Sequence, residues 1–230
     1  MRFSAALVAT AAAMFLVPFP AFANPTQQDG YEVIFGGYLD GVYADISLDT
    51  ASPYSTECLL ADSVATDVPN SQQIEAGDAV CGSSFSLDFN CVSPGGNGRY
   101  DEIWTGGNNY TCTRHGAVTY GSGVGFKLMR TASNSTMYAY IAGVQEEHTT
   151  GLQRVDTIGY AWEEGTAATA PPCNNSWSFY ALYSQFQVYG IGQGGWQSAT
   201  PYAVTYDQPS TCITRTNIVA NSFDLYHNAP

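Results

Sequence analysis

The sequence predicts an all-β protein built as a single antiparallel β-sandwich of jelly-roll type. Three observations predict this fold class. Apolar and polar residues alternate along many short segments, and clusters of Gly, Pro and Asn separate those segments. Few stretches have the period of about 3.6 residues that marks a helix. An N-terminal leader and six cysteines indicate an oxidising compartment, where disulfides can support such a fold.

The start of the chain has the features of a secretory signal peptide. Arg2 is its only charged residue, an apolar run covers Ala5–Val17, and Ala21–Ala23 form an A-x-A cleavage site. The run is shorter than the roughly 18 apolar residues that a transmembrane helix needs, and no later run reaches that length. We therefore expect residues 1–23 to be removed and residues 24–230 to form one secreted β-sandwich domain without a membrane span.

Strand patterns follow one another along the mature chain. In the clearest of them apolar side chains occupy every second position, as in a strand with one buried face. Such segments are Val42–Leu48, Phe85–Cys91, Val124–Leu128 and Met137–Ile141, and longer β-rich runs are Leu152–Glu164, Ser176–Tyr189 and Asn217–Tyr226. Only Glu57–Thr66 has a pattern that suits a short helix. Many short strands divided by turns predict a jelly roll of the concanavalin-like kind.

Glycine-rich clusters between these segments predict turns, because glycine adopts the positive φ angles that many turns require. One of them, Gly190–Gly195, matches the G-x-G-x-x-G of dinucleotide-binding loops. That loop must open a helix, and a further strand pattern follows here instead. We therefore expect a turn at this place and no cofactor.

The six cysteines are expected to form three disulfides. They are Cys58, Cys81, Cys91, Cys112, Cys173 and Cys212, and no two of them have the close spacing that is typical of zinc sites. The three histidines are also far apart, so we expect no metal. Sequence order alone allows many pairings. We expect neighbours along the chain to pair, with Cys91–Cys112 and Cys173–Cys212 each closing a loop rich in hairpins.

The chain is strongly acidic, with a formal net charge of −13, and Lys127 is its only lysine. Nucleic acids and anionic lipids are bound through basic surfaces, so we expect neither as a partner. An extracellular polymer or glycan suits the composition better, and the oligomeric state stays open. The acidity has two interpretations: it keeps an extracellular protein soluble, or it suits work at low pH, where many carboxylates are neutral.

Aromatic residues are abundant, with 16 tyrosines and 4 tryptophans. Most of them are expected to fill the core or to pair across strands. Several others lie at polar positions or strand ends beside carboxylates, and these form a candidate binding face for amphipathic ligands such as sugar rings. The candidate ligand-binding residues are Tyr100, Glu102, Trp104, Trp162 and Trp196.

A second candidate site consists of carboxylates within strand patterns: Glu75, Glu102, Glu163 and Glu164. Glu164 shares one face of its strand with Tyr160 and Trp162, and burial beside these rings would suit it to act as a general acid. Two carboxyl groups about 5–9 Å apart would suit glycoside cleavage. The alternative is that all these groups are solvated carboxylates of an acidic surface.

Four short motifs stand in order along the chain: Gly41–Ile46, Gln73–Gly77, Tyr100–Trp104 and Tyr138–Gly143. They resemble landmarks of uncharacterised secreted bacterial β-sandwich proteins, which in turn resemble the glutamic peptidases, or eqolisins. The resemblance covers Gly41 to Glu164 through short motifs only. It implies a jelly-roll sandwich and an acid-active endopeptidase that uses a Gln and a Glu on neighbouring strands.

The chain departs from the eqolisin pattern at both catalytic positions that the resemblance implies. Glu75 stands where that family has Gln, and Trp162–Glu164 match the second motif incompletely. An amide at the first position would polarise the substrate carbonyl and hold the water, and a carboxyl cannot replace it directly. Two glutamates could instead share a proton, as the carboxyl pairs of aspartic peptidases do.

These observations favour a secreted, non-enzymatic protein that binds extracellular carbohydrate or another surface polymer through its aromatic and carboxylate residues. The alternative is an acid-active hydrolase of glutamic-peptidase or glycosidase type that uses Glu75 with Glu163 or Glu164. A structural envelope protein also fits the sequence. A cleft that holds the glutamates together would favour the hydrolase, and exposed tryptophan rings would favour the binding protein.

Overall fold

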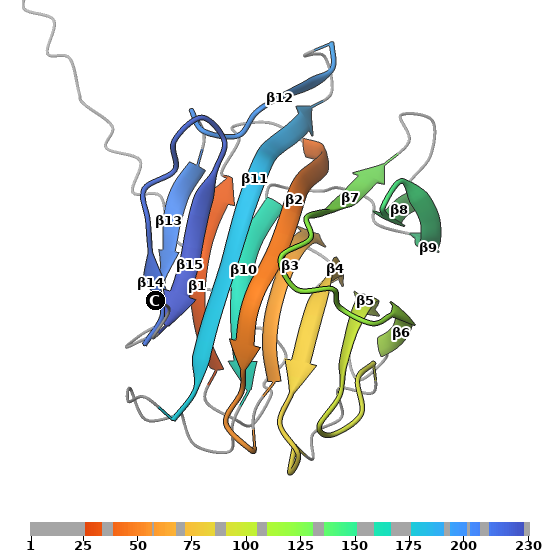
Figure 1. Ribbon diagram of the computed structural model, residues 1–230. Helices are drawn as coiled ribbons and strands as arrows, with labels where there is room; N and C mark the ends of the chain where they lie inside the picture. The colour runs from red at the N-terminus through yellow and green to blue at the C-terminus, as the bar shows by residue number, and fades with distance from the viewer. Residues whose placement is uncertain are drawn as a thin grey trace, which may run out of the picture.

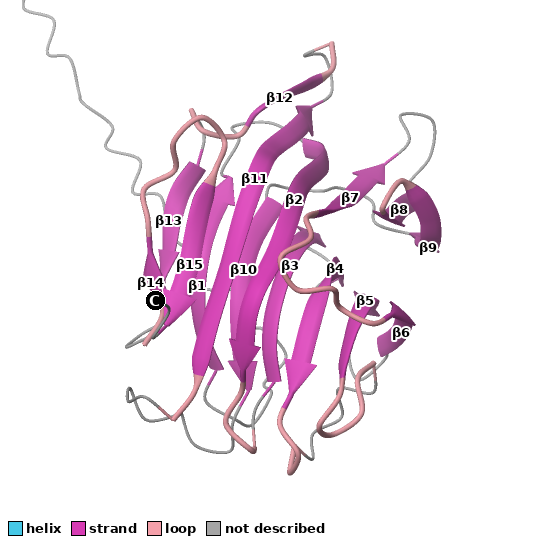
Figure 2. Ribbon diagram, viewed as in Figure 1, coloured by secondary structure: helices cyan, strands magenta, loops and turns pink. Residues whose placement is uncertain are grey.

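The structure is a computed structural model, and it describes the chain in twelve segments. They are residues 26–33, 39–56, 58–67, 72–85, 91–104, 110–130, 136–150, 159–166, 176–190, 194–201, 203–207 and 212–227. The expected signal peptide, residues 1–23, lies outside them. In the described segments the chain forms strands and turns and no helix (Figure 2). Among these same residues there is accordingly no helix of the length and apolarity needed to cross a membrane.

Two antiparallel sheets face each other, and β11 and β2 of one sheet run in front of β10 and β3 of the other (Figure 1). The seven strands of sheet A are, in spatial order, β13 (Ala203–Asp207), β1 (Thr26–Val33), β10 (Gly159–Thr166), β3 (Cys58–Asp67), β4 (Gln72–Cys81), β5 (Asn97–Trp104) and β6 (Tyr110–Gly116). Sheet B contains β14 (Thr214–Arg215), β15 (Phe223–His227), β11 (Ser178–Gly190), β2 (Leu39–Ser52), β7 (Val124–Arg130), β8 (Thr136–Ile141) and β9 (Val144–Thr150), and β12 (Trp196–Ser198) pairs with β11. The prediction of an all-β, disulfide-bonded, antiparallel jelly-roll sandwich is confirmed.

The main hydrophobic core lies between the two sheets, because every second side chain of each strand points inward. Sheet A contributes Leu59 and Ile74, and sheet B contributes Phe126 and Tyr183, all of them fully buried. The ring of Tyr183 stacks on Phe223 with 4.6 Å between centroids. Each such large side chain contributes roughly 1.5–3 kcal/mol to folding when it is fully buried.

The alternating patterns predicted three strands of sheet B correctly. Val42–Leu48 lie within β2, Val124–Leu128 within β7 and Met137–Ile141 within β8, and the apolar set of each is buried. Of the longer runs, Ser176–Tyr189 largely coincide with β11. Asn217–Tyr226 contribute only their last residues to β15, because a turn at 220–221 precedes that strand.

The prediction of a short helix at Glu57–Thr66 is wrong. Cys58–Asp67 form β3, a central strand that pairs with β10 on one side and with β4 on the other. The residues Cys58, Leu59, Leu60 and Ala61 are all buried, although successive side chains point to opposite faces. A strand that is buried on both faces has a continuous apolar run instead of an alternation, and such a run does not distinguish a strand from a helix.

A second, smaller core lies on the outer face of sheet A, which is turned away from sheet B. It contains Leu60, Ala79 and Tyr100, together with Phe85 and Val92 from the segment after β4. Residues 86–90 lie outside the described residues, so the predicted strand at 85–91 is described only at its two ends, and neither end is in a strand. The chain after β4 therefore covers part of this outer face.

Two of the three expected disulfides are described, and both join neighbouring cysteines as predicted. Cys58 and Cys81 are directly opposite each other on β3 and β4. Cys91–Cys112 joins the segment after β4 to β6, with 5.3 Å between the Cα atoms. Cys212 is also disulfide-bonded, and Cys173, its expected partner, lies outside the described residues.

Candidate functional site

Glu75 on β4 and Glu102 on β5 lie directly opposite each other in the strand register. Their neighbours Ile74, Ala76 and Ile103 point into the core between the sheets, so both glutamates belong to the outer face of sheet A. Only 4% of Glu75 and 7% of Glu102 are exposed. Residues opposite each other in an antiparallel pair have Cβ atoms about 4.5–5.5 Å apart, which brings the two carboxyl groups within reach of each other.

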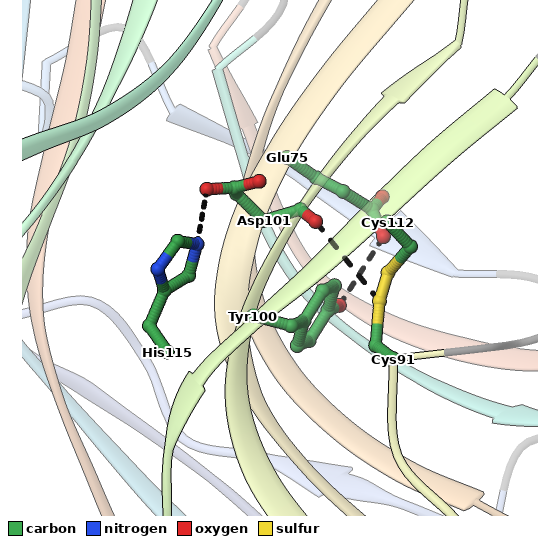
Figure 3. Close-up of a disulfide and its surroundings, with 6 residues drawn as sticks. All are labelled: Glu75, Cys91, Tyr100, Asp101, Cys112 and His115. Atoms are coloured by element: carbon green, nitrogen blue, oxygen red, sulfur yellow. Dashed lines mark hydrogen bonds and ion pairs between the residues drawn. A yellow bond between two sulfur atoms is a disulfide. The ribbon is translucent and has the colours of Figure 1, made fainter.

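Tyr100 places a phenol beside the Glu75 carboxyl group (Figure 3). Its Oη donates a hydrogen bond to Oε1 of Glu75 at 3.2 Å, and the side chain is fully buried. The residue opposite Tyr100 on β4 is Gly77, which has no side chain on this face. The ring therefore has room to lean along β4 toward Glu75, two residues away. A hydroxyl donor favours the ionised form of the carboxyl that accepts its bond.

The Cys91–Cys112 disulfide lies beside the Glu102 carboxyl group, and Figure 3 shows it together with Glu75 and Tyr100. Cys112 is directly opposite Glu102, and a carboxylate oxygen of Glu102 lies within 4.8 Å of both sulfur atoms. Because both sulfurs belong to a disulfide, they supply no thiolate to a metal. The disulfide instead gives Glu102 a low-polarity neighbour, and it fixes the segment after β4 above this part of the sheet.

Glu102 and Glu75 belong to a row of opposed residues that continues across sheet A onto β3 and β10. Glu75 is opposite Val64 of β3, and Val64 is opposite Tyr160 of β10. The next row on the same face joins Tyr100, Gly77, Asp62 and Trp162. The outer face of sheet A thus brings together register positions of carboxyl and aromatic residues from four strands.

The predicted partners of Glu75 on β10 lie farther away than Glu102 in this register. Glu164 is four residues along β10 from Tyr160, which corresponds to about 13 Å along the strand. Glu163 alternates with Glu164 and so belongs to the other face of β10. The side chains of both residues lie outside the described part of the chain. The pairing of Glu75 with either of them stays a prediction.

The five predicted ligand-binding residues divide between the two sheets. Tyr100 and Glu102, as well as the register positions of Trp104 and Trp162, belong to sheet A. The side chains of Trp104 and Trp162 lie outside the described part of the chain. Trp196 lies on β12, beside β11 of sheet B, and its ring is half-buried. Trp196 is therefore on a different sheet from the other four.

The inner face of sheet A carries a buried ion pair that sequence reasoning missed. Asp78 Oδ1 lies 3.5 Å from Nε of Arg99, and Asp78 is 1% exposed. Burial raises the pKa of the Asp78 carboxyl from 3.8 to about 7, although the Arg99 guanidinium opposes this shift. Neither carboxylate oxygen of Asp78 has a hydrogen-bond partner among the described residues. Alternation could have placed Asp78 on the core face, between Ala76 and Val80.

A second charged cluster on that face contains the half-buried imidazole of His115 on β6 (Figure 3). Its Nε2 lies 2.5 Å from Oδ2 of Asp101, and its Nδ1 lies 3.1 Å from Oε2 of Glu146 on β9. Asp101 is fully buried. This group joins the edge of sheet A to the edge of sheet B, and no spacing in the sequence indicates it.

Comparisons with known proteins identify the fold. No protein-family model and no curated protein matches the chain. Among solved structures, scytalido-glutamic peptidase with a transition-state analogue inhibitor matches with a TM-score of 0.58 at 12% identity, over 87% of this chain and 98% of that chain. The chain has the fold of the glutamic peptidases.

Two further matches belong beside it. A member of the eqolisin family in complex with the tripeptide Ala-Ile-His matches with a TM-score of 0.52 at 12% identity, over 89% of this chain and 99% of that one. A β-glucanase of Bacillus licheniformis matches with a TM-score of 0.36 at 12% identity, over 83% of this chain and 64% of that one. The jelly-roll fold that the resemblance implied is confirmed, and the identities establish the fold alone.

Proposed function

We propose that this chain is an acid-active peptidase that hydrolyses peptide bonds on the outer face of sheet A, with Glu75 and Glu102 as its catalytic carboxyl pair. The observation that carries this proposal is the opposed position of two nearly buried glutamates on adjacent strands. Ionising both carboxyl groups is unfavourable because they are close together and nearly buried. We therefore expect the two groups to share one proton below neutral pH. A shared proton supplies an acid and a base in the same site.

The surroundings of the two carboxyl groups suggest which one is the base. Glu75 accepts a hydrogen bond from Tyr100, which favours its ionised form. Glu102 lies beside the Cys91–Cys112 disulfide and the small core of the outer face, which favour its neutral form. We therefore assign Glu75 as the general base and Glu102 as the general acid.

The proposed reaction has two steps in which the protons balance. In the first, Glu75 takes a proton from a water molecule while the water oxygen bonds to the peptide carbonyl carbon, and Glu102 gives its proton to the carbonyl oxygen. In the second, Glu75 gives its proton to the leaving nitrogen as the C–N bond breaks, and Glu102 takes a proton from one hydroxyl of the intermediate. The pair then returns to its starting state.

The glutamic peptidases supply the substrate class in this proposal, since their fold is shared by the chain and one of them is described in complex with a tripeptide. The proposal replaces the predicted partner of Glu75. Where that family has a Gln and a Glu, this chain would use two glutamates, with Glu102 opposite Glu75 in place of Glu163 or Glu164 on β10.

The test is to incubate residues 24–230, purified with disulfides intact, with an unfolded protein and with a panel of polysaccharides at pH 3–7. We expect new peptide amino termini below about pH 5, where one proton is shared, and no activity in the Glu75→Gln variant. Glu146→Gln, the same change at an exposed glutamate of sheet B, should keep full activity. Release of sugars without release of peptides would reject the peptidase proposal and favour the glycosidase alternative. No release at any pH would reject a hydrolase.

Binding without catalysis is the second candidate function. It was the first expectation from the sequence, and one observation favours it: the half-buried ring of Trp196 lies on the outer face of sheet B, away from the proposed catalytic pair. Retention on a polymer without any release of fragments would support this candidate.

A further inference from the structure

We propose that the outer face of sheet B is a binding site for an uncharged polysaccharide chain, in which Trp196, Tyr43 and Tyr189 stack against sugar rings and Asp45 accepts hydrogen bonds from their hydroxyl groups. This site lies on the opposite side of the sandwich from Glu75 and Glu102. It is an addition to the proposed peptidase activity and does not depend on it.

Trp196 is held in place by contacts with three residues on this face: Tyr189, Tyr43 and Gly41. Its backbone pairs with Tyr189 of β11, and its ring lies 5.5 Å from the Tyr189 ring and 6.2 Å from the Tyr43 ring, measured between centroids. The end of the indole lies above Gly41, where a Cβ atom would be 3.0 Å from Cη2. The glycine therefore makes room for the indole. All three rings are half-buried, so each keeps an accessible part.

Asp45 is fixed beside these rings as an acceptor. Its Oδ1 accepts a hydrogen bond from Tyr43 Oη and its Oδ2 accepts one from Nε2 of Gln185, each at 2.5 Å. A carboxylate can accept about four hydrogen bonds, so these two leave capacity for ligand hydroxyls. Burial and the Asp45 hydrogen bond raise the pKa of Tyr43 to about 12, which keeps the phenol a donor.

The backbone of β11 is distorted at the residue that holds Asp45. The register with β2 shifts between Ser184 and Gln187, and Gln185 adopts a φ of +54°. Within this bulge the Phe186 side chain enters the core, and the Phe186 N–H donates to the Asn221 carbonyl instead of to β2. A non-glycine residue in this conformation is strained, and such strain is found at functional sites more often than elsewhere. Here it directs the Gln185 amide toward Asp45.

The charge of the chain selects the class of glycan. Lys127, the only lysine, has its Nζ 3.9 Å above the centroid of the Tyr140 ring, next to Tyr43 in the register. Asp45 and the net charge of −13 repel anionic polymers. Aromatic rings attract the apolar faces of sugars without requiring charge, so a neutral chain fits this face best.

The test is retention of residues 24–230 on three polysaccharides: a neutral β-glucan, anionic alginate and cationic chitosan. We expect retention on the β-glucan that persists at 1 M salt, and none on alginate. Trp196→Ala should weaken retention about tenfold, a loss of about 1.4 kcal/mol. Tyr54→Ala removes a 40% exposed tyrosine elsewhere and should change nothing. Glu75→Gln should abolish the proposed hydrolysis and leave retention intact, which separates the two proposals.

The outcomes that would overturn the proposal are equally specific. They are absence of retention on the β-glucan, retention on chitosan alone that disappears with salt, and full retention by Trp196→Ala. If the Trp196→Ala variant does not fold, the site can be tested on the wild-type protein instead. Oxidation of Trp196, followed by mass spectrometry, should slow in the presence of soluble β-glucan, and an unchanged rate would contradict the site.

Discussion

Tyr100 Oη donates a hydrogen bond to Glu75 Oε1 at 3.2 Å, across the position where Gly77 leaves the sheet surface without a side chain. This contact distinguishes Glu75 from Glu102, because it stabilises a negative charge on one of two opposed carboxyl groups. In our account it decides which glutamate is the base.

Replacing Tyr100 by Phe removes this donor and keeps the ring. We expect the acid limb of the pH–rate profile to move to higher pH, because Glu75 then ionises less readily, and kcat/KM at pH 4 to fall about tenfold. Stability should fall by about 1 kcal/mol, the usual net contribution of one buried hydrogen bond. Tyr54→Phe is the control and should keep the wild-type pH–rate profile. An unshifted profile in Tyr100→Phe would contradict a role of Tyr100 in the mechanism.

Because the pKa of the buried Asp78 carboxyl is raised, we expect the free energy of unfolding to increase as the pH falls. Its folded pKa is about 7, and an unfolded aspartate titrates near 4. The folded state therefore binds an additional proton between these values, so the contribution is complete below about pH 4 and is lost as pH rises through 7. The full difference is on the order of 4 kcal/mol.

The measurement is urea unfolding at pH 4, 5.5 and 7.5. Asp78→Asn should lose less stability than the wild type over this range, whereas Asp49→Asn, on an exposed site of β2, should keep the wild-type slope. Identical slopes in all three proteins would show that Asp78 is ionised throughout.

The two described disulfides form a matched pair for mutagenesis, since they close loops with similar separations of 21 and 23 residues. Removal of either one, as a double Cys→Ala variant, should cost about 3 kcal/mol. Only removal of Cys91–Cys112 should also lower the proposed peptidase activity, measured below the variant's transition temperature, because this disulfide lies beside Glu102. Equal activity losses in the two variants would contradict a specific role.

His115 should stabilise the sandwich without taking part in the proposed chemistry. His115→Ala leaves the fully buried Asp101 without this partner, and we expect a loss of about 1–3 kcal/mol in urea unfolding. Glu146→Ala removes a more exposed partner and should cost less. The kcat of both variants well below their unfolding temperatures should equal that of the wild type. A larger loss from Glu146→Ala would reverse this interpretation.

Prediction from the sequence was most successful for strands that have one buried face and one face exposed to solvent. Val42–Leu48 and Met137–Ile141 have this alternation, and both segments form strands as predicted. It failed at Cys58–Ala61, where both faces are buried and the alternation disappears. The pairing of neighbouring cysteines could be predicted because antiparallel strands that follow each other in the sequence often lie side by side, which brings their cysteines close together.

The candidate site was less accessible to sequence reasoning than the fold. Glu75 and Glu102 were both selected as candidate carboxylates, but Glu75 was paired with Glu163 or Glu164, because its opposition to Glu102 depends on the register of β4 against β5. A shift of one residue in that register would place them apart. The contacts of Trp196 with Tyr43 and of His115 with Glu146 likewise join segments that no local pattern connects.

The most direct test of the central claim is the value of kcat/KM for the wild type, Glu75→Gln, Glu102→Gln and the double variant, on one protein substrate at pH 4. If the two glutamates act as one unit, each single variant loses nearly all activity, and the double variant loses no more than either single variant. Wild-type activity in either single variant, with its folding verified by urea unfolding, would contradict the carboxyl pair.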